Sequence, residues 1–260
     1  MKKYKSIGES KNIDKDISVI MPVCNEAESL QFLCGEVVNC IEELNMTYEM
    51  IFVDAGSRDN SFEVLCHLRE MFKQMLVIKL KKQYGQSVAL AAGIYYSRGG
   101  IVITMDADLQ NNPKDISLFI NKVKEGYDIV CGWRKTRQDP YLTKVLFSII
   151  GNKILSRLSR IRVHDFSCTF KAFKKDAAKK IGNKLHSGLH RFIPLIARNF
   201  CFSICEIKIS HRPRLYGKSK YSFFRVFKAL IDYLILKIRG DSIKDVPKER
   251  LLLYIEKIII

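Results

Sequence analysis

The sequence lacks the glycine-rich patterns by which many nucleotide-binding proteins hold phosphate groups. No G-x-G-x-x-G follows the first predicted strand, and no G-x-x-x-x-G-K-[ST] occurs anywhere in the 260 residues. These absences argue against a dinucleotide-dependent enzyme and against a P-loop NTPase.

Long uninterrupted apolar runs are also lacking. The most apolar stretch, Tyr221 to Ile238, is broken by Arg225, Lys228, Asp232 and Lys237, whereas a membrane-spanning helix needs about 20 mostly uncharged residues. The charges recur at helical spacing, opposite a face formed by Phe224, Phe227, Leu230 and Leu234. We therefore expect an amphipathic helix, which would either pack on the core or lie on a membrane.

Paired cysteine spacings and a secretory signal are lacking too. None of the eight cysteines forms a C-x-x-C pair, and residues 1–16 are polar. This pattern predicts reduced thiols in a cytoplasmic protein with a flexible N-terminus, and disfavours a disulfide scaffold.

Acidic residues are scarce in the second half of the chain. Residues 1–130 hold 15 Lys and Arg against 18 Asp and Glu, whereas residues 131–260 hold 29 against 9. The formal net charge of +17 is therefore carried by the second half. Such an excess favours a phosphate-rich or anionic-membrane partner for that half.

Short β-branched runs alternate with helix-length segments in the first half. The predicted strands are Ile17–Met21, Met50–Val53, Met75–Leu80, Ile101–Met105 and Asp128–Cys131, and the helices between them are Glu28–Leu44, Ser61–Met71, Gln86–Tyr96 and Pro113–Glu125. This rhythm predicts an α/β fold with a mostly parallel central sheet and helices on both faces.

The rhythm breaks after Gly132. The segments expected beyond it are a long helix over Tyr141–Leu158, a helix near His190–Asn199, a strand near Phe202–Lys208 and the amphipathic helix. We expect the boundary between a nucleotide-binding half and an acceptor half at Gly132–Arg134.

Two carboxylates follow the buried strand Ile101–Met105. Asp106 and Asp108 are two residues apart, so in an extended chain they point the same way. Ligands of open α/β sheets bind outside the carboxyl ends of strands. The pair can therefore hold a hard divalent cation, with Gln110 adding a neutral oxygen.

Several segments in the same order resemble the family-2 glycosyltransferases. Residues 17–26 (ISVIMPVCNE) resemble that family's VVIPVYNE, residues 52–59 (FVDAGSRD) its VDDGSxD, residues 85–93 (GQSVALAAG) its GQTAALxAG, and residues 105–113 (MDADLQNNP) its MDADLQDPP. The resemblance implies the nucleotide-diphospho-sugar transferase fold (GT-A, Rossmann-like). It also implies sugar transfer from a nucleotide sugar.

Later segments resemble the polyprenyl-phosphate branch, which contains dolichol-phosphate mannosyltransferase and its bacterial undecaprenyl-phosphate relatives. They are residues 132–137 (GWRKTR), 165–171 (DFSCTFK), 190–192 (HRF) and 214–221 (RLYGKSKY). The resemblance implies a catalytic domain over 17–220, divided into a nucleotide-binding half (17–132) and an acceptor half (133–220). Residues 1–16 would form a flexible N-terminus, and 221–260 the amphipathic helix and tail.

The chain departs from the family pattern in three places. Ala55 replaces the second Asp of VDDGS, which removes any base or ribose contact of that carboxylate, while Asp54 remains. Ser167 and Thr169 replace both glycines of the family's DxGCGFK, which would reshape the acceptor side. Many bacterial relatives carry two membrane helices after the SKY sequence, where this chain has one charged amphipathic segment and a short tail, Leu251–Ile260.

The resemblance implies a role for each matching residue on the donor side. Pro22, Asn25, Glu26 and Asp54 would frame the base and ribose of a UDP- or GDP-sugar, with Gln86 close by. Residues 22–26 read equally well as a turn and helix cap. Mg²⁺ or Mn²⁺ on Asp106, Asp108 and Gln110 would bridge both phosphates and stabilise the departing diphosphate.

The acceptor implied by the branch is a lipid phosphate, whose oxygen is already ionised near neutral pH. The enzyme then needs cations more than a strong general base. Arg134, Arg137, Arg214 and Lys220 are the matching cations, because Arg suits bidentate phosphate contacts and Lys supplies a point charge; Ser219 could add a hydrogen bond.

Two residues of the second half keep alternative readings. Asp165 could position the sugar or phosphate, or cap local backbone. Trp133 could stack on a sugar or belong to the core. The five histidines share no metal-like spacing and are expected to be packing or surface residues.

The sequence therefore predicts a metal-dependent enzyme that transfers a sugar to a polyprenyl phosphate. It would be cytoplasmic and peripheral to the inner face of the membrane, with an integral-membrane partner as an option. The nearest alternative is a family-2 enzyme with a polysaccharide or other glycan acceptor. A nucleic-acid-binding protein is disfavoured because no aromatic-basic binding motif appears. A non-catalytic paralogue, suggested by Ala55, is disfavoured by the intact Asp106 and Asp108.

Overall fold

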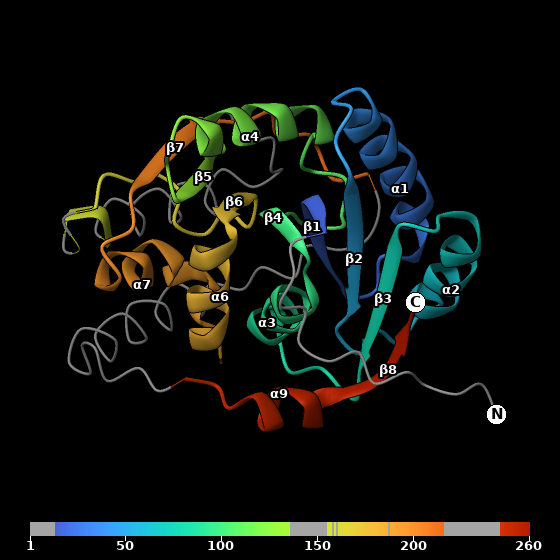
Figure 1. Ribbon diagram of the computed structural model, residues 1–260. Helices are drawn as coiled ribbons and strands as arrows, with labels where there is room; N and C mark the ends of the chain where they lie inside the picture. The colour runs from blue at the N-terminus through green and yellow to red at the C-terminus, as the bar shows by residue number, and fades with distance from the viewer. Residues whose placement is uncertain (1–13, 136–154, 158, 160, 187, 216–244) are drawn as a thin grey trace.

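One mixed sheet forms the centre of the computed structural model, which describes residues 14–135, 155–157, 159, 161–186, 188–215 and 245–260 (Figure 1). Its strands are β1 (Lys15–Val23), β2 (Tyr48–Asp54), β3 (Met75–Leu80), β4 (Gly99–Thr104), β5 (Ile129–Trp133), β6 (Lys171–Lys174), β7 (Ile204–Lys208) and β8 (Ile255–Ile259). The order across the sheet is β7-β5-β6-β4-β1-β2-β3-β8. Strands β4, β1, β2 and β3 are mutually parallel, whereas β6 and β8 run antiparallel to their neighbours.

Helices cover both faces of this sheet. The core on one face involves α1 (Ala27–Glu42), α2 (Ser61–Met71) and α4 (Ile116–Lys124), which follows the short 3-10 helix η1 (Pro113–Asp115). The core on the other face involves α3 (Gln86–Tyr96), α6 (Lys175–Lys184), η2 (Leu189–Phe192), α7 (Ile193–Asn199) and α9 (Lys248–Tyr254). The predicted α/β fold, with a mostly parallel sheet between helices, is confirmed.

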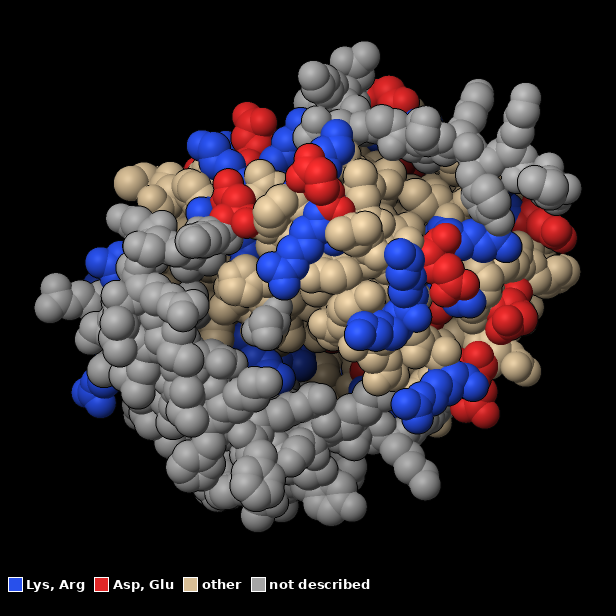
Figure 2. All heavy atoms as spheres, turned by 90° about the horizontal axis from the view of Figure 1, so that it is seen from below, with Lys and Arg blue, Asp and Glu red and all other residues tan. Residues whose placement is uncertain are grey.

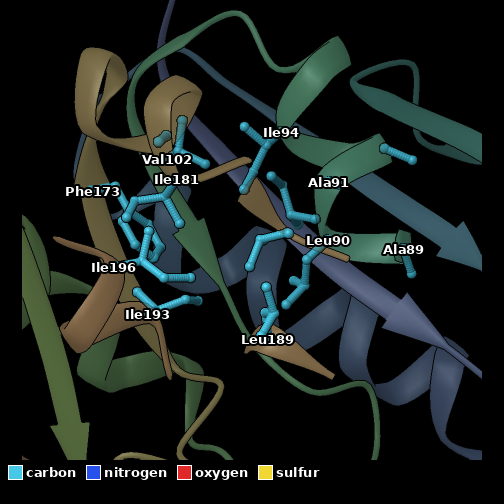
Figure 3. Packing of buried hydrophobic residues seen from close by; sticks show 14 of the residues in the cluster. Ala89, Leu90, Ala91, Ile94, Val102, Phe173, Ile181, Leu189, Ile193 and Ile196 are labelled. Atoms are coloured by element: carbon cyan, nitrogen blue, oxygen red, sulfur yellow. The ribbon is translucent and has the colours of Figure 1, made fainter. Parts of the chain in front are cut away.

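Helix α3 lies inside the second core rather than on its surface. Nine of its eleven residues are buried, and Figure 3 shows Leu90 and Ile94 pointing towards the residues of α6, η2 and α7. Two glycines permit this close packing. A Cβ on Gly93 would meet Ile20 of β1 at 2.3 Å, and one on Gly182 would meet Ile94 at 2.8 Å. Helix α3 is thereby held closely against β1 and α6, and Gln86 lies at its amino end.

Strand β6 brings the second half of the chain to the end of β4. It inserts between β4 and β5, with Ala172 opposite Ile103 on one side and Val130 on the other. The Thr104 hydroxyl donates to the carbonyl of Thr169 at 2.6 Å. The segment that precedes β6 therefore lies beside the residues that follow β4, which include Asp106 and Asp108. Both halves of the chain thus contribute strands to one sheet.

The last residues of the chain, expected as a short tail, form the edge strand β8. β8 pairs with β3, Leu251 of α9 is buried in the core, and the Tyr254 ring packs against the Tyr84 ring, with centroids 4.2 Å apart and planes tilted by 33°. The predicted amphipathic helix over 221–238 and most of the predicted helix 141–158 lie outside the described residues. In the part of the chain that is described, no helix has both the length and the apolar character needed to cross a membrane. All eight cysteines are free thiols, as expected.

Candidate functional site

The first acidic residue of the site, Asp106, lies just beyond the end of β4. Its Oδ1 accepts a hydrogen bond from Gln86 Nε2 at 2.7 Å, and Gln86 also donates to the Thr169 hydroxyl at 3.1 Å. Gln86 can reach it because Gly85, at φ = 90°, turns the chain directly into α3. Burial, followed by the nearby Asp108 carboxylate, raises the pKa of Asp106 to about 6, although Arg134 and the hydrogen bonds oppose the rise.

The chain around the two acidic residues is not the extended strand on which their spacing argument depends, because residues 107–109 form a bend. Strand β4 ends at Thr104, and Leu109 takes a left-handed conformation at φ = 62° while its side chain is buried. Such a conformation is costly for a branched residue and persists only where its surroundings enforce it. Asp108 is nevertheless close enough to Asp106 to raise that residue's pKa. The turn, rather than an extended strand, brings the carboxylates together.

Arg214, six residues after the end of β7, reaches this acidic turn. Its guanidinium Nη2 donates to Asp108 Oδ2 and, at 3.3 Å, to Gln110 Oε1, while Nη1 lies 3.5 Å from Glu26 Oε1. The Asp108 side chain is only 10% exposed. Arg214 thus contacts both Asp108 and Gln110 directly.

Arg134, at the end of β5, forms a buried bidentate ion pair with Asp165. Nε donates to Oδ2 at 2.8 Å and Nη2 donates to Oδ1 at 3.1 Å, and the Ser167 hydroxyl bonds both partners. The side chains are 13% and 5% exposed. Burial alone would lower the pKa of Arg134, but the Asp165 carboxylate more than offsets this and holds it above its ordinary value.

Asp165 accepts from Arg134 on both carboxylate oxygens and so orients the guanidinium. Asp165 is itself fixed by Glu206 of β7, whose carboxylate accepts the backbone N–H groups of His164 and Asp165 at 2.8 and 3.0 Å. The Trp133 ring is covered by the His164 ring, with centroids 4.2 Å apart and planes at 13°. Neither Glu206 nor His164 carried a signal in the sequence.

Hydrogen bonds join the loop after β1 to the loop after β2 on the predicted donor side. Asn25, at φ = 54°, accepts the Arg58 N–H on its Oδ1 at 2.7 Å, and its own N–H donates to Ser57 at 3.0 Å. Asn25 therefore does not cap α1. The helix begins after Glu26, and its first N–H groups donate to Asp59 and Ser61 of the neighbouring loop.

Asp54 ends β2 with one carboxylate oxygen engaged and one available. Oδ1 accepts the Ser57 N–H at 3.0 Å, whereas Oδ2 is buried without a hydrogen-bond partner among the described residues. Buried acceptors are almost always satisfied in folded proteins. Pro22 lies one strand away, opposite Val53. Ala55, which replaces the family's second Asp, is buried and donates its N–H to Val23.

These side chains sit at the edge where the parallel strands end. Figure 2 views the molecule from below Figure 1, the side on which α9 lies, and shows a hollow with Lys and Arg atoms on its floor. Of the predicted cations, Arg137 and Lys220 lie outside the described residues.

The oxygen ligands at the acidic turn fit a hard divalent cation. Carboxylate and amide oxygens are what Mg²⁺ and Mn²⁺ prefer, and the guanidinium already seated on Asp108 and Gln110 shows that these oxygens converge on positive charge. Within the described ranges no cluster of three or more His, Cys, Asp or Glu could hold a metal. Such a cation would therefore depend on the two Asp, on Gln110 and on oxygens of its substrate.

The match to a family model places this chain in a class of sugar-transferring enzymes. The model described as glycosyl transferase family 2 matches residues 18–182, which is more than half of the sequence. The chain belongs to glycosyltransferase family 2.

Solved structures of similar fold include enzymes that act on phosphoglycerate. Glucosyl-3-phosphoglycerate synthase from Mycobacterium tuberculosis, in complex with Mn²⁺, UDP and glucosyl-3-phosphoglycerate, is 17% identical with a TM-score of 0.60, covering 90% of this chain and 82% of that one. Mannosyl-3-phosphoglycerate synthase from Rubrobacter xylanophilus is 14% identical with a TM-score of 0.62, covering 88% and 75%. At these identities the likeness establishes the shared fold.

Proposed function

We propose that this enzyme transfers a sugar from a nucleoside diphosphate sugar to an acceptor that carries a phosphate group. The observation that supports this most is the pairing of two adjacent carboxylates, Asp106 and Asp108, with two half-buried or buried arginines, Arg134 and Arg214, at one edge of the sheet. Carboxylates suit a metal-bound diphosphate, and arginines suit the phosphate of an acceptor.

Divalent metal would be held by Asp106, Asp108 and Gln110. When bound, Mg²⁺ or Mn²⁺ supplies positive charge that stabilises the departing diphosphate. Gln86 and Thr169 hold Asp106 in place by hydrogen bonds. The Mn²⁺ and UDP present in the similar solved structures support the same donor chemistry for this chain.

The nucleotide would lie over the loops after β1 and β2. Asp54 Oδ2 offers a buried acceptor for a base N–H group, which uracil and guanine both possess. Asn25 and Glu26 border the same loops. Because Ala55 replaces a carboxylate, Asp54 is the one acidic residue of the 54–55 pair that would contact the nucleotide.

Two phosphate-bearing acceptors are supported by different observations. The segments around Asp165 and Arg214 resemble those of enzymes that use polyprenyl phosphate, whereas the solved structures named above include phosphoglycerate complexes. In the first acceptor the phosphate oxygen is the nucleophile and is already ionised; in the second a hydroxyl attacks and the phosphate serves for recognition. A glycan acceptor remains the alternative that uses no phosphate.

Access to a lipid acceptor would require contact with a membrane. We propose a peripheral approach from the cytoplasmic side, through residues 221–239 or through an integral-membrane partner. The excess of basic residues in the second half supports attraction to anionic headgroups.

A two-step assay tests the proposal. Thermal shifts with UDP, GDP and their sugars, with and without Mn²⁺, identify the donor base. Transfer is then measured to undecaprenyl phosphate, to 3-phosphoglycerate and to a neutral oligosaccharide. Mn²⁺-dependent transfer to either phosphorylated acceptor supports the proposal. Transfer to the neutral oligosaccharide alone contradicts it.

A further inference from the structure

Arg214 is attached to the two side chains that the proposed function assigns to the metal. Its Nη2 donates to both Asp108 and Gln110, and its Nη1 approaches Glu26. In sequence Arg214 is 106 residues from Asp108, so the contact is made by the fold and not by local chain geometry. The Arg214 side chain is 24% exposed, against 10% for each carboxylate.

The backbone that carries Arg214 is held firmly beside the acidic turn. Arg212 donates its N–H to the Gln110 carbonyl at 2.9 Å, and its guanidinium binds Glu36 at 2.8 Å. The Ser210 N–H donates to Asp115 at 2.7 Å. Because residues 210–212 are anchored on the same segment as Gln110, the guanidinium of Arg214 is delivered to the turn by a fixed stretch of chain.

A guanidinium and a divalent cation cannot use the same oxygens at once. Asp108 Oδ2 and Gln110 Oε1 both accept from Nη2, and a metal coordinated by Asp108 and Gln110 would stand where those N–H groups now point. The two cations also repel each other across a partly buried site.

We propose that Arg214 is an internal competitor of the donor metal: it occupies Asp108 and Gln110 until the metal displaces it. This inference rests on the proposed function. Displacement frees a guanidinium beside the donor diphosphate, where it can bind the phosphate of the acceptor. The two roles of Arg214, contact with Asp108 and contact with the acceptor, are then successive. The acceptor site is completed only after the metal-bound donor has entered.

The test compares Mn²⁺ affinity, measured by electron paramagnetic resonance without nucleotide, in the wild-type protein and two variants. Arg214→Gln keeps a polar side chain but removes the charge that competes. Arg212→Gln is the matched control, since Arg212 belongs to the same segment and its guanidinium binds Glu36 and Asn112 rather than Asp108 or Gln110.

Competition predicts that Arg214→Gln binds Mn²⁺ roughly tenfold more tightly, because a charge-assisted hydrogen bond to Asp108 no longer has to be broken. Arg212→Gln should stay within about twofold of the wild type, so that a gain in both variants would indicate general charge repulsion and overturn direct competition. Equal or weaker Mn²⁺ binding by Arg214→Gln would also overturn it.

Asp108→Asn separates this inference from the proposed function. If the wild type binds Mn²⁺ and Asp108→Asn does not, the metal site stands, and only the result for Arg214→Gln decides the competition. If Asp108→Asn binds Mn²⁺ as well as the wild type, the metal site itself is wrong and the competition falls with it.

Discussion

Replacing Asp165 by Asn tests whether the buried ion pair with Arg134 stabilises the folded protein as strongly as its burial and geometry indicate. The change leaves the shape of the side chain but removes the charge that compensates a guanidinium only 13% exposed. Breaking a buried pair from one side costs about 3–5 kcal/mol, since the remaining charge stays buried without compensation. For a chain of this size, each kcal/mol lowers the melting temperature by roughly 2–4 °C. We therefore expect a fall of about 10 °C.

Urea denaturation and thermal unfolding, followed by circular dichroism, measure the change. Lys122→Met is the matched control: it breaks the Lys122–Glu125 pair, whose side chains are 38% and 51% exposed, and an exposed pair contributes at most about 1 kcal/mol. The double variant Arg134→Met/Asp165→Leu removes both charges and should recover part of the loss. A cost below about 1 kcal/mol for Asp165→Asn would refute the reasoning, because the pair would then behave like an exposed one.

Three further outcomes are expected. The raised pKa of Asp106, about 6, means that the folded protein holds this proton more tightly than the unfolded chain. The stabilisation from this group is therefore present at acid pH and lost as pH rises through about 6, and a flat difference between wild type and Asp106→Asn in denaturation from pH 4 to 7 would contradict it. Arg214→Ala and Lys220→Ala should each cut transfer to a phosphorylated acceptor by at least tenfold without weakening donor binding; equal loss of donor binding would assign them to the nucleotide. In a flotation assay the protein should bind anionic vesicles at low salt, be released by high salt, and bind less when Phe224→Glu/Phe227→Glu is introduced without unfolding it. No binding at low salt would contradict direct membrane contact and would mean that the enzyme uses a membrane partner or a soluble acceptor.

The first half of the fold could be predicted from sequence because its signals are local. The predicted bounds of Ser61–Met71, Met75–Leu80 and Gln86–Tyr96 agree with α2, β3 and α3. These segments have apolar residues at helix or strand spacing, with turn residues such as Gly85 between them. Strand β8 was not predicted, since its pairing with β3 depends on residues 175 or more positions apart and on no local turn signal.

The candidate site was predictable in its residue types but not in its contacts. Asp106 and Asp108 follow a buried strand, which fixes their place at the sheet edge. The extended chain expected between them is absent from the structure, because β4 ends at Thr104 and residues 107–109 form a bend. No sequence pattern indicated that Arg134 would bind Asp165, or that Arg214 would bind Asp108, since these pairs meet only when β5 and the segment after β7 join the sheet.

The departures at Ser167 and Thr169 acquire a physical meaning only in the folded protein. Both were expected to reshape the acceptor side because they replace glycines. The Ser167 hydroxyl bonds Arg134 and Asp165, and the Thr169 hydroxyl accepts from Gln86, which donates to Asp106. The two hydroxyls thus belong to two hydrogen-bonded groups, one around Arg134 and one around Asp106.

Calorimetric titration of the donor diphosphate into wild type and Asp108→Asn, each with and without Mn²⁺, tests the central claim most directly. The account predicts that the wild type binds UDP or GDP tightly only when Mn²⁺ is present. Asp108→Asn should have the melting temperature of the wild type, but Mn²⁺ should no longer increase its affinity for the nucleotide. Unchanged Mn²⁺-dependent affinity in Asp108→Asn would contradict the assignment of the donor site to the turn after β4.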